Sequence, residues 1–194
     1  NFDATDGLQS QEFNFNSYCL LSSGDVRFGG IKGVHIFKPG DVSDNTYVPP
    51  VVLTSFNVLG EPMALEKSLQ STDAVELIYT QNFFSFEFAA LDFVAPAKNQ
   101  YAYRLVGVDE DWNRSGTRRF ASYTQVKPGE YAFQVTGSNN DRVWNTKGTS
   151  FRIVIKPPFW ATAWFNVLLF LLILTTATLA YRYRIAKLLE VERM

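Results

Sequence analysis

The stretch YAYRLVGVDEDW, residues Tyr101–Trp112, decides the fold of this 194-residue chain. Its first half alternates, with Tyr101, Tyr103 and Leu105 at odd positions and Ala102 and Arg104 between them. A period of two residues is typical of a β-strand, because successive side chains point to opposite faces of a sheet. One face of this strand is apolar and the other carries an arginine. The pattern therefore predicts a strand with one buried face and one wet face.

The same alternation recurs on both sides of this strand, at 84–88, 131–136 and 151–155. Turn sequences such as Lys127-Pro128-Gly129-Glu130 separate the segments, and Gly129 is expected to supply the positive φ of a tight turn. About seven such strands in roughly a hundred residues predict an antiparallel immunoglobulin-like β-sandwich over residues 51–156. The Cys…Trp…Cys pattern of antibody domains is absent, since Cys19 is the only cysteine.

The part before the sandwich is different in character. Residues 1–41 hold three shorter apolar segments, at 17–21, 26–28 and 34–37, with Gly-rich turns between them. Three strands this short bury too little surface to be stable alone, which is the situation of a single β-propeller blade. Residues 42–50, VSDNTYVPP, have the composition of a linker.

After the sandwich, residues 157–181 carry no charged side chain. A membrane span needs ~20 mostly apolar residues to cross ~30 Å of hydrocarbon. Trp160 and Trp164 stand at one end of the run, and Tyr181 and Tyr183 stand at the other, as in the aromatic belts of membrane proteins. A helix buried in a soluble core would show a polar stripe at helical spacing, which this run lacks. We therefore expect one transmembrane helix over 157–181.

The tail after the span is short and basic. Residues 182–194 carry a net charge of +2 and residues 1–156 a net charge of −3. The charges next to the span differ too little to set its orientation. Ile185, Leu188 and Leu189 are spaced i, i+3 and i+4, and Glu192 interrupts the pattern. The tail either begins a signalling helix or is only a charged flank. We expect both ends of the chain to be cuts in a longer protein, because Asn1 is preceded by no start methionine or signal peptide.

No catalytic arrangement can be assembled from the sequence. His35 is the only histidine, so no Ser-His-Asp or Cys-His arrangement is expected, and Cys19 with His35 supplies too few ligands for a metal. The run Asp109-Glu110-Asp111 lacks the spacing of a calcium loop and is expected to be a solvated turn. The net charge of −1 argues against nucleic-acid binding. We expect no catalytic residue, cofactor site, metal site or nucleic-acid partner in this segment.

The order of the aromatic residues resembles that of a known bacterial family, the three-tyrosine (Y_Y_Y) domain. That domain lies between a β-propeller of the two-component-regulator type and a membrane span. The name-giving positions correspond to Tyr103, Tyr123 and Tyr131. The surrounding motif corresponds to Leu105, Gly107, Asp109, Trp112, Pro128, Gly129, Asn139 and Trp144. Where the family usually has a glycine, this chain has Arg142-Val143. Because aromatics on alternating strands are mostly core, we expect the three tyrosines to pin strands rather than to contact a ligand.

The stretch GDVRFGGIKGVHIFKP, residues 24–39, resembles the last blade of such a propeller, with Val26 in place of the usual aromatic. Together the resemblances imply the periplasmic part of a Gram-negative sensor in the inner membrane. Residues 1–156 would be periplasmic and residues 182–194 cytoplasmic. The implied output is a histidine kinase, hybrid kinases included, or a diguanylate cyclase. The implied partner is a second copy of the chain. The ligand, an oligosaccharide for example, would bind to the missing propeller.

A second function stays open. The chain is alternatively a membrane-anchored carbohydrate-binding module. In that case Tyr47, Trp112 or Trp144 would stack on sugar rings.

Overall fold

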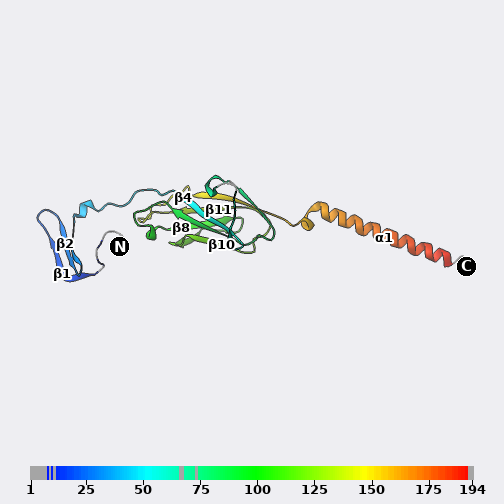
Figure 1. Cartoon of the computed structure of the whole chain (residues 1–194), viewed down its shortest axis with the longest axis horizontal. Coiled ribbons are helices and arrows are strands. Elements are labelled where there is room, and N and C mark those ends of the chain that lie inside the picture. Colours follow the sequence, from blue (N-terminus) through cyan, green and yellow to red (C-terminus); the bar gives the residue numbers. More distant parts are fainter. Residues whose placement is uncertain (1–7, 9, 11, 66–67, 73, 192–194) are drawn as a thin grey trace.

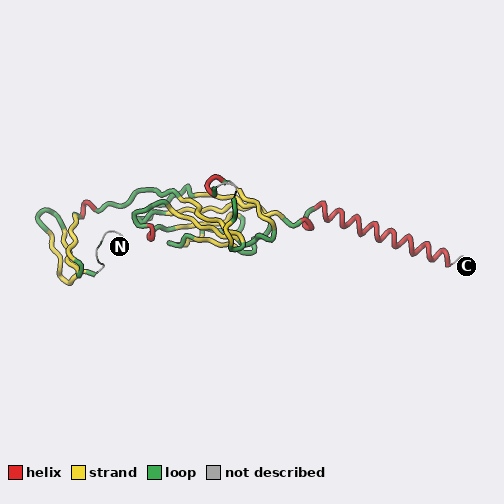
Figure 2. Tube along the Cα trace, viewed as in Figure 1, coloured by secondary structure: helices red, strands yellow, loops and turns green. Residues whose placement is uncertain are grey.

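The computed structural model describes residues 8, 10, 12–65, 68–72 and 74–191. A small sheet, a two-sheet sandwich and a long helix follow one another along the chain (Figure 1). Figure 2 shows the strands of the sandwich between the small sheet at one end and the helix at the other. The predicted fold class is therefore confirmed: a β-sandwich, preceded by a small sheet and followed by one helix.

The small sheet contains three antiparallel strands in the order β1-β2-β3: β1 (Phe13–Leu20), β2 (Val26–Gly30) and β3 (Gly33–Phe37). β1 begins four residues earlier than expected. The Phe28 ring lies 5.7 Å from the Phe13 ring and 6.0 Å from the Phe37 ring, between ring centroids. No residue of these strands is buried. The sheet therefore has no core of its own, as its length predicted.

The sandwich is built from two sheets. The four-stranded sheet has the order β10-β7-β4-β5, with β10 (Phe120–Tyr123), β7 (Phe84–Ala90), β4 (Val51–Val58) and β5 (Glu61–Pro62). The five-stranded sheet has the order β6-β12-β11-β8-β9, with β6 (Ala74–Ile78), β12 (Thr149–Lys156), β11 (Gly129–Gly137), β8 (Tyr101–Val106) and β9 (Asn113–Gly116). Short 3₁₀ turns lie at Pro39–Asp41 (η2), Leu69–Ser71 (η3), Pro96–Lys98 (η4) and Phe159–Ala161 (η5).

The alternating side chains meet between the two sheets, as the sequence pattern predicted. Phe86 of β7 stacks on Phe133 of β11, with ring centroids 4.0 Å apart and planes 7° apart, and both are fully buried. Phe151 of β12 packs against Phe86 at 5.9 Å. The most buried large side chains are Tyr101, Phe84, Phe86, Phe88, Phe133, Phe151, Leu77, Leu105, Ile153 and Ile155. Burial of these apolar side chains is the main force holding the sheets together.

The prediction of antiparallel strands is wrong for one pair. β6 runs parallel to β12, with Ala74 opposite Arg152 and Ile78 opposite Lys156. β6 reaches this position through the long connection that leaves β5 in the other sheet. β6 and β12 can pair in parallel because a long stretch of chain, β7 to β11, connects them, and the alternation of side chains is the same for either strand direction. The sequence pattern therefore predicted the buried face of β6 but not its direction.

The long helix α1 covers Ala163–Val191. It begins six residues after the start of the charge-free run 157–181, because Pro157 and Pro158 keep the chain extended before η5. Residues Ala163–Ile185 are long and apolar enough to cross a membrane, and none of their most apolar stretch is buried within the chain. The aromatic residues expected at the two ends, Trp160, Trp164, Tyr181 and Tyr183, are exposed. The side chains of Leu188 and Leu189 and the whole of Glu192 lie outside the described residues.

Candidate coupling site

The predicted motif residue Asn139 lies in the loop after β11 and contacts the segment that enters the sandwich. Its side chain is fully buried. The amide nitrogen Nδ2 donates to the carbonyl oxygens of Asn45 and Tyr47, the latter at 2.9 Å. The amide oxygen Oδ1 accepts from the backbone N–H groups of Asp141 and Val143, both at 2.9 Å. One side chain thus joins the loop to residues 45–47, and removing it would leave buried polar groups unpaired.

Three further contacts fasten the same segment. Asn145 Nδ2 donates to the carbonyl oxygen of Pro49 at 2.9 Å, and Thr149 Oγ1 donates to the carbonyl oxygen of Val51. The backbone N–H of Asn45 donates to Asp141 Oδ2 at 2.6 Å. Composition alone indicated a linker over 42–50. The structure shows that residues 45–50 are held against the sandwich, because loop asparagines satisfy backbone groups that a free linker leaves to water.

The turn that carries Asn139 has an unusual backbone at Arg142. This residue has φ +65°, in the left-handed region that favours glycine. Its N–H donates to the carbonyl oxygen of Asn139 at 3.2 Å, which closes the turn. Trp144, half-buried, follows and forms a β-bridge with Ser138. The turn therefore keeps a glycine-type conformation even though its sequence has no glycine.

The three motif tyrosines pin strands to their neighbours, as expected. Tyr103 packs its ring between Phe88, at 5.9 Å, and Phe133, at 6.1 Å. The Tyr131 hydroxyl donates to the carbonyl oxygen of Lys127 at 2.9 Å, four residues upstream. This contact has the geometry of the tyrosine corner of immunoglobulin-like domains. Tyr123, mostly buried, is fastened through Asp109.

Asp109 does not match the prediction that the acidic run 109–111 is a solvated turn. Asp109 Oδ2 accepts from the Tyr123 hydroxyl at 2.6 Å and from the Leu105 backbone N–H at 2.7 Å. Burial, and then the hydrogen bond to Asp109, raise the pKa of Tyr123 well above its usual value of 10.0. Glu110 and Asp111 are exposed, as expected. The prediction of a solvated turn is therefore wrong for Asp109, since a buried phenol hydroxyl needs an acceptor and this carboxylate provides it.

The two motif glycines make room for the Tyr131 ring. A Cβ on Gly107, which has φ +98°, would lie 3.1 Å from Tyr131 Cδ1. A Cβ on Gly129 would lie 3.2 Å from the Tyr131 hydroxyl oxygen. The expectation of a positive φ at Gly129 is wrong, because this residue is already in the extended strand β11. Its role is close approach to the Tyr131 side chain.

Sequence reasoning missed other residues of this architecture. Tyr101 is 2 % exposed, and its hydroxyl oxygen accepts from the Ala90 N–H at 3.2 Å. It thus joins the two sheets as the motif tyrosines do. Asn45 and Asn145 were also missed. Their signal was the group of asparagines and aspartates in residues 44–45 and 139–145, residue types that often bond to nearby backbone groups.

The ring of Trp112, the remaining motif residue, lies against the guanidinium group of Arg104. The Arg104 guanidinium carbon lies 4.8 Å from the centroid of the Trp112 ring, and Arg104 Nε also donates to Gln134 Oε1 at 2.8 Å. This arrangement covers one face of the ring and orders the wet side of β8 and β11. Trp112 thus belongs to a different part of the sandwich from Asn139.

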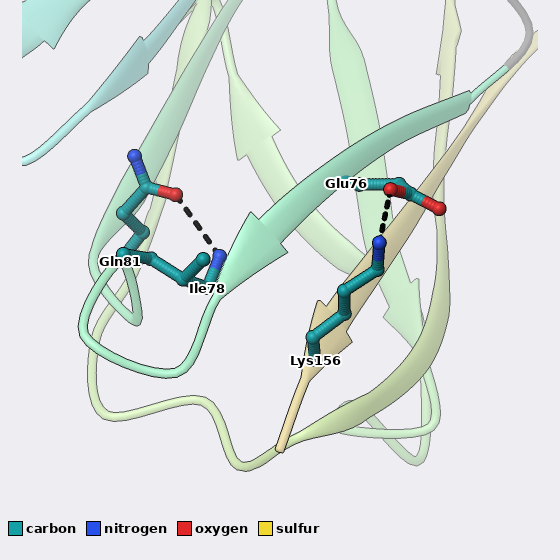
Figure 3. Close-up of polar contacts among 4 residues, drawn as sticks. All are labelled: Glu76, Ile78, Gln81 and Lys156. Carbon is teal, nitrogen blue, oxygen red and sulfur yellow. Dashed lines mark hydrogen bonds and ion pairs between the residues drawn. The ribbon is translucent and has the colours of Figure 1, made fainter. Parts of the chain in front are cut away.

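The opposite end of the sandwich is joined to the helix. Lys156, the last residue of β12, pairs with Glu76 of β6, and the Ile78 N–H donates to Gln81 Oε1 at 3.0 Å (Figure 3). Both partners of the ion pair are more than half exposed, so it contributes only ~0–1 kcal/mol. Tyr79, after β6, meets the Trp160 ring edge-on at 5.1 Å. Parallel pairing and ring contact together orient the chain as it leaves the sheet.

One strand connects these two ends. β12 begins at Thr149, which bonds to Val51 at the linker end, and ends at Lys156, just before the helix. Its eight residues cover ~26 Å at about 3.3 Å per residue. β12 pairs with β11 on one side and β6 on the other, and Ile153 is fully buried. It is therefore a stiff connection between the linker junction and the membrane helix.

No group of three or more His, Cys, Asp or Glu side chains is gathered to hold a metal in the part of the chain that the structure describes. His35 packs its ring edge-on against Phe13, with centroids 5.6 Å apart, and Cys19 is exposed.

Residues 92–156 match the Y_Y_Y domain. The predicted resemblance is thus confirmed over β8 to β12, which contain all three name-giving tyrosines. A protein named histidine kinase P4, from Formosa agariphila, is 38 % identical over an alignment of 186 residues, and the alignment covers 92 % of this chain and 13 % of that protein. The Y_Y_Y domain therefore occurs here in a segment that is similar to part of a histidine kinase.

Two solved structures share the fold. One is the extracellular domain of the "putative hybrid two component system BT3049" from B. thetaiotaomicron, with 27 % identity and a TM-score of 0.66 over 81 % of this chain and 22 % of that one. The other is the extracellular domain of BT4673 from the same organism, with 23 % identity and a TM-score of 0.53 over 78 % of this chain and 21 % of that one. The chain thus spans less than a quarter of each of these relatives. It resembles part of the extracellular domain of a two-component sensor, and it carries one C-terminal helix that is long and apolar enough to cross a membrane.

Proposed function

We propose that this chain couples a sensor domain outside the cytoplasm to a membrane helix and to a kinase beyond it. The proposal rests on one observation. The segment that enters the sandwich and the helix that leaves it are both joined to strand β12 or to the loop that precedes it. Residues 45–51 are bonded to Asn139, Asn145 and Thr149 at one end of the sandwich. The helix follows directly from the other end of β12.

Such an arrangement transmits movement because neither connection is slack. A displacement of residues 45–51 must move the loop after β11 or break its hydrogen bonds. The packed core of the sandwich passes this movement on, since protein interiors are close-packed and do not deform continuously. The sandwich would therefore act as a rigid lever on α1.

The sensor itself would be the β-propeller whose last blade is the three-stranded sheet. That sheet leaves its phenylalanines without a core, which is what a blade cut from its neighbours would show. The ligand would bind to the propeller, and an oligosaccharide is our candidate. Residues 1–156 would be periplasmic, α1 would cross the inner membrane, and residues 182–194 would be cytoplasmic. The output would be a histidine kinase, a hybrid kinase included, or a diguanylate cyclase.

The mechanism needs a second copy of the chain. A single helix that shifts in a membrane has nothing to shift against, whereas two helices in a dimer can rotate or scissor relative to each other. We propose that ligand binding favours one arrangement of the two protomers over another. A full-length sensor that stays monomeric with and without signal, and still signals, would overturn this part of the proposal.

The coupling is tested in the full-length sensor, reconstituted in lipid nanodiscs. Kinase autophosphorylation is measured with and without a mixture of oligosaccharides from digests of plant and algal polysaccharides. Asn139→Ala releases the linker, so we expect at least a ~5-fold loss of the ligand-dependent change. Tyr101→Phe is the matched control, because it removes one buried hydrogen bond between the sheets and leaves the linker contacts intact. An Asn139→Ala sensor that responds like the wild type would contradict the proposal.

The same oligosaccharide mixture tests the alternative function, a carbohydrate-binding module. Calorimetry on the 194-residue chain alone should give no binding heat if the propeller holds the ligand. Binding heat that disappears with Tyr47→Ala or Trp144→Ala would instead favour a membrane-anchored glycan-binding module.

A further inference from the structure

Asp92 is a buried carboxylate without a cationic partner. It is 3 % exposed and lies in the connection between β7 and β8. Its Oδ1 accepts from Asn45 Nδ2 at 3.1 Å. Its Oδ2 meets no donor among the residues that the structure describes. A buried carboxylate that lacks a cation or a full set of donors is among the most costly groups to bury, so something must neutralise it.

A second oxygen in the same connection is also left over. Asn99 is 1 % exposed, and its Nδ2 donates to the backbone carbonyl oxygen of Asp92 at 3.2 Å. This bond ties the two residues together and leaves Asn99 Oδ1 with no donor in the described part of the chain. Two unpaired oxygens, one of them on a carboxylate, thus belong to neighbouring side chains in the sandwich interior.

Other side-chain oxygens surround Asn45 next to Asp92. Asn140 Oδ1 accepts from the same Asn45 Nδ2 at 2.8 Å, and Asp141 Oδ2 accepts from the Asn45 backbone N–H at 2.6 Å. The junction therefore combines two carboxylates, Asp92 and Asp141, and three side-chain amides, Asn45, Asn99 and Asn140, from the linker and two loops. No sulfur or imidazole is part of this set.

We propose that this junction binds a calcium ion, with Asp92 as its principal charged ligand and Asn99 Oδ1 as a neutral one. Oxygen-only donors from carboxylates and amides are the ligands Ca²⁺ takes, and Ca²⁺ tolerates irregular geometry where Mg²⁺ requires an octahedron. Asp92 is the only carboxylate of this set with a buried unpaired oxygen among the described residues, so the charge on the site is low. A dissociation constant on the order of 10⁻⁴–10⁻³ M follows, as in extracellular calcium modules.

The ion would have a structural role at the coupling site. Asp92 and Asn99 lie before β8, and Asn45 belongs to the linker that Asn139 holds. Calcium would neutralise Asp92 and so strengthen the contact between that loop and the linker. The calcium proposal does not depend on the proposed signalling function, because it rests only on the buried oxygens of Asp92 and Asn99.

The test uses the 194-residue chain in detergent micelles, freed of metal with EDTA and dialysed. Titration with CaCl₂ is followed by calorimetry and by thermal unfolding monitored through tryptophan fluorescence. We expect saturable binding of one ion and a rise of a few degrees in the unfolding midpoint at 10 mM Ca²⁺, roughly as ligand linkage predicts for such an affinity. MgCl₂ at the same concentration should give a clearly smaller rise.

Two variants decide the assignment. Asp92→Asn keeps the shape and removes the charge. It should abolish the calcium response and, in EDTA, unfold at the same temperature as the wild type or higher. Asp111→Asn, which removes an exposed carboxylate from the acidic turn, should keep the full response. Calcium binding that survives Asp92→Asn, or no binding by the wild type, would overturn the proposal.

Discussion

At the scale of single residues, the turn after β11 combines a very well satisfied side chain with a strained backbone. Asn139 makes four hydrogen bonds through its side chain, while Arg142, three positions later, stays in the left-handed region. A left-handed conformation costs a residue with a Cβ ~1–2 kcal/mol relative to glycine. The bonds of Asn139 are what hold Arg142 in place, because Val143 beyond it is one of the donors to Asn139.

Arg142→Gly should therefore stabilise the sandwich. Relief of the left-handed strain is opposed by the greater freedom of glycine in the unfolded chain, so the net gain should be about 1 kcal/mol or less. The measurement is the thermal unfolding midpoint of the 194-residue chain in detergent. Arg142→Ala, which keeps a Cβ, is the control and should not raise the midpoint. A lower midpoint for Arg142→Gly would show that the arginine side chain itself stabilises the turn.

Tyr123 predicts a loss of stability in alkaline solution. Its pKa is raised in the folded state by burial and by Asp109, so the folded protein keeps the proton when the unfolded chain has lost it. Stability from this group is complete below pH 10 and falls as the pH rises beyond that value. Tyr123→Phe should have a lower unfolding midpoint at pH 8, because Asp109 loses a donor, but a shallower decline between pH 9.5 and pH 11. Equal slopes for the two proteins would contradict this assignment.

At the scale of elements, two glycines leave room for the Tyr131 ring at the start of strand β11. Gly107, just after β8, lies against the face of the Tyr131 ring, and Gly129 lies against its hydroxyl. The ring can therefore reach back to Lys127 and close the corner at the start of β11. The motif spacing between Gly107, Gly129 and Tyr131 thus describes one packed corner.

Gly107→Ala should destabilise the sandwich more than Gly60→Ala. Both glycines have a positive φ, +98° and +89°, so both alanines carry a similar backbone strain. Only the Cβ at position 107 meets the Tyr131 ring, at 3.1 Å, whereas position 60 is open. We expect a difference of about 1 kcal/mol or more in unfolding free energy, measured by chemical denaturation in detergent. Equal losses would show that the Tyr131 ring moves aside at no cost.

At the scale of the whole molecule, the elongated order of small sheet, sandwich and helix sets the direction of any signal (Figure 1). The long helix has its apolar side chains exposed over Ala163–Ile185, so a membrane is the environment that its surface requires. The two ends of the chain would then lie on opposite sides of that membrane.

Cys19 allows the orientation to be tested directly. It is the only cysteine in the chain and is exposed on β1. In spheroplasts that express the 194-residue chain, a membrane-impermeant maleimide should label Cys19 without permeabilisation. In a second protein, Cys19→Ser combined with Lys187→Cys should be labelled only after the membrane is opened. The reverse pattern would place residues 1–156 in the cytoplasm.

Much of this architecture could be predicted from the sequence, and the reason is local. Period-two alternation decides which side chains can share a face of a strand. It therefore predicts that Phe86, Phe133 and Phe151 lie on the buried faces of their strands. A charge-free run bounded by aromatic residues likewise indicates a membrane helix, because its length and polarity need no partner to be understood. The order and spacing of Tyr103, Tyr123 and Tyr131 likewise indicated the Y_Y_Y domain, because such a motif is visible along the sequence itself.

Only the tertiary structure decided how distant segments meet. The sequence shows neither the parallel direction of β6 beside β12 nor the contacts of residues 45–50 with Asn139 and Asn145, because partners so far apart in the sequence leave no local pattern. The acidic run predicted a solvated Asp109, but its carboxylate accepts a hydrogen bond from the Tyr123 hydroxyl. Composition reports what a side chain prefers, whereas burial and hydrogen bonding depend on what the fold brings beside it. The sequence by itself therefore determined the elements and their faces, and the fold decided which of them are joined to one another.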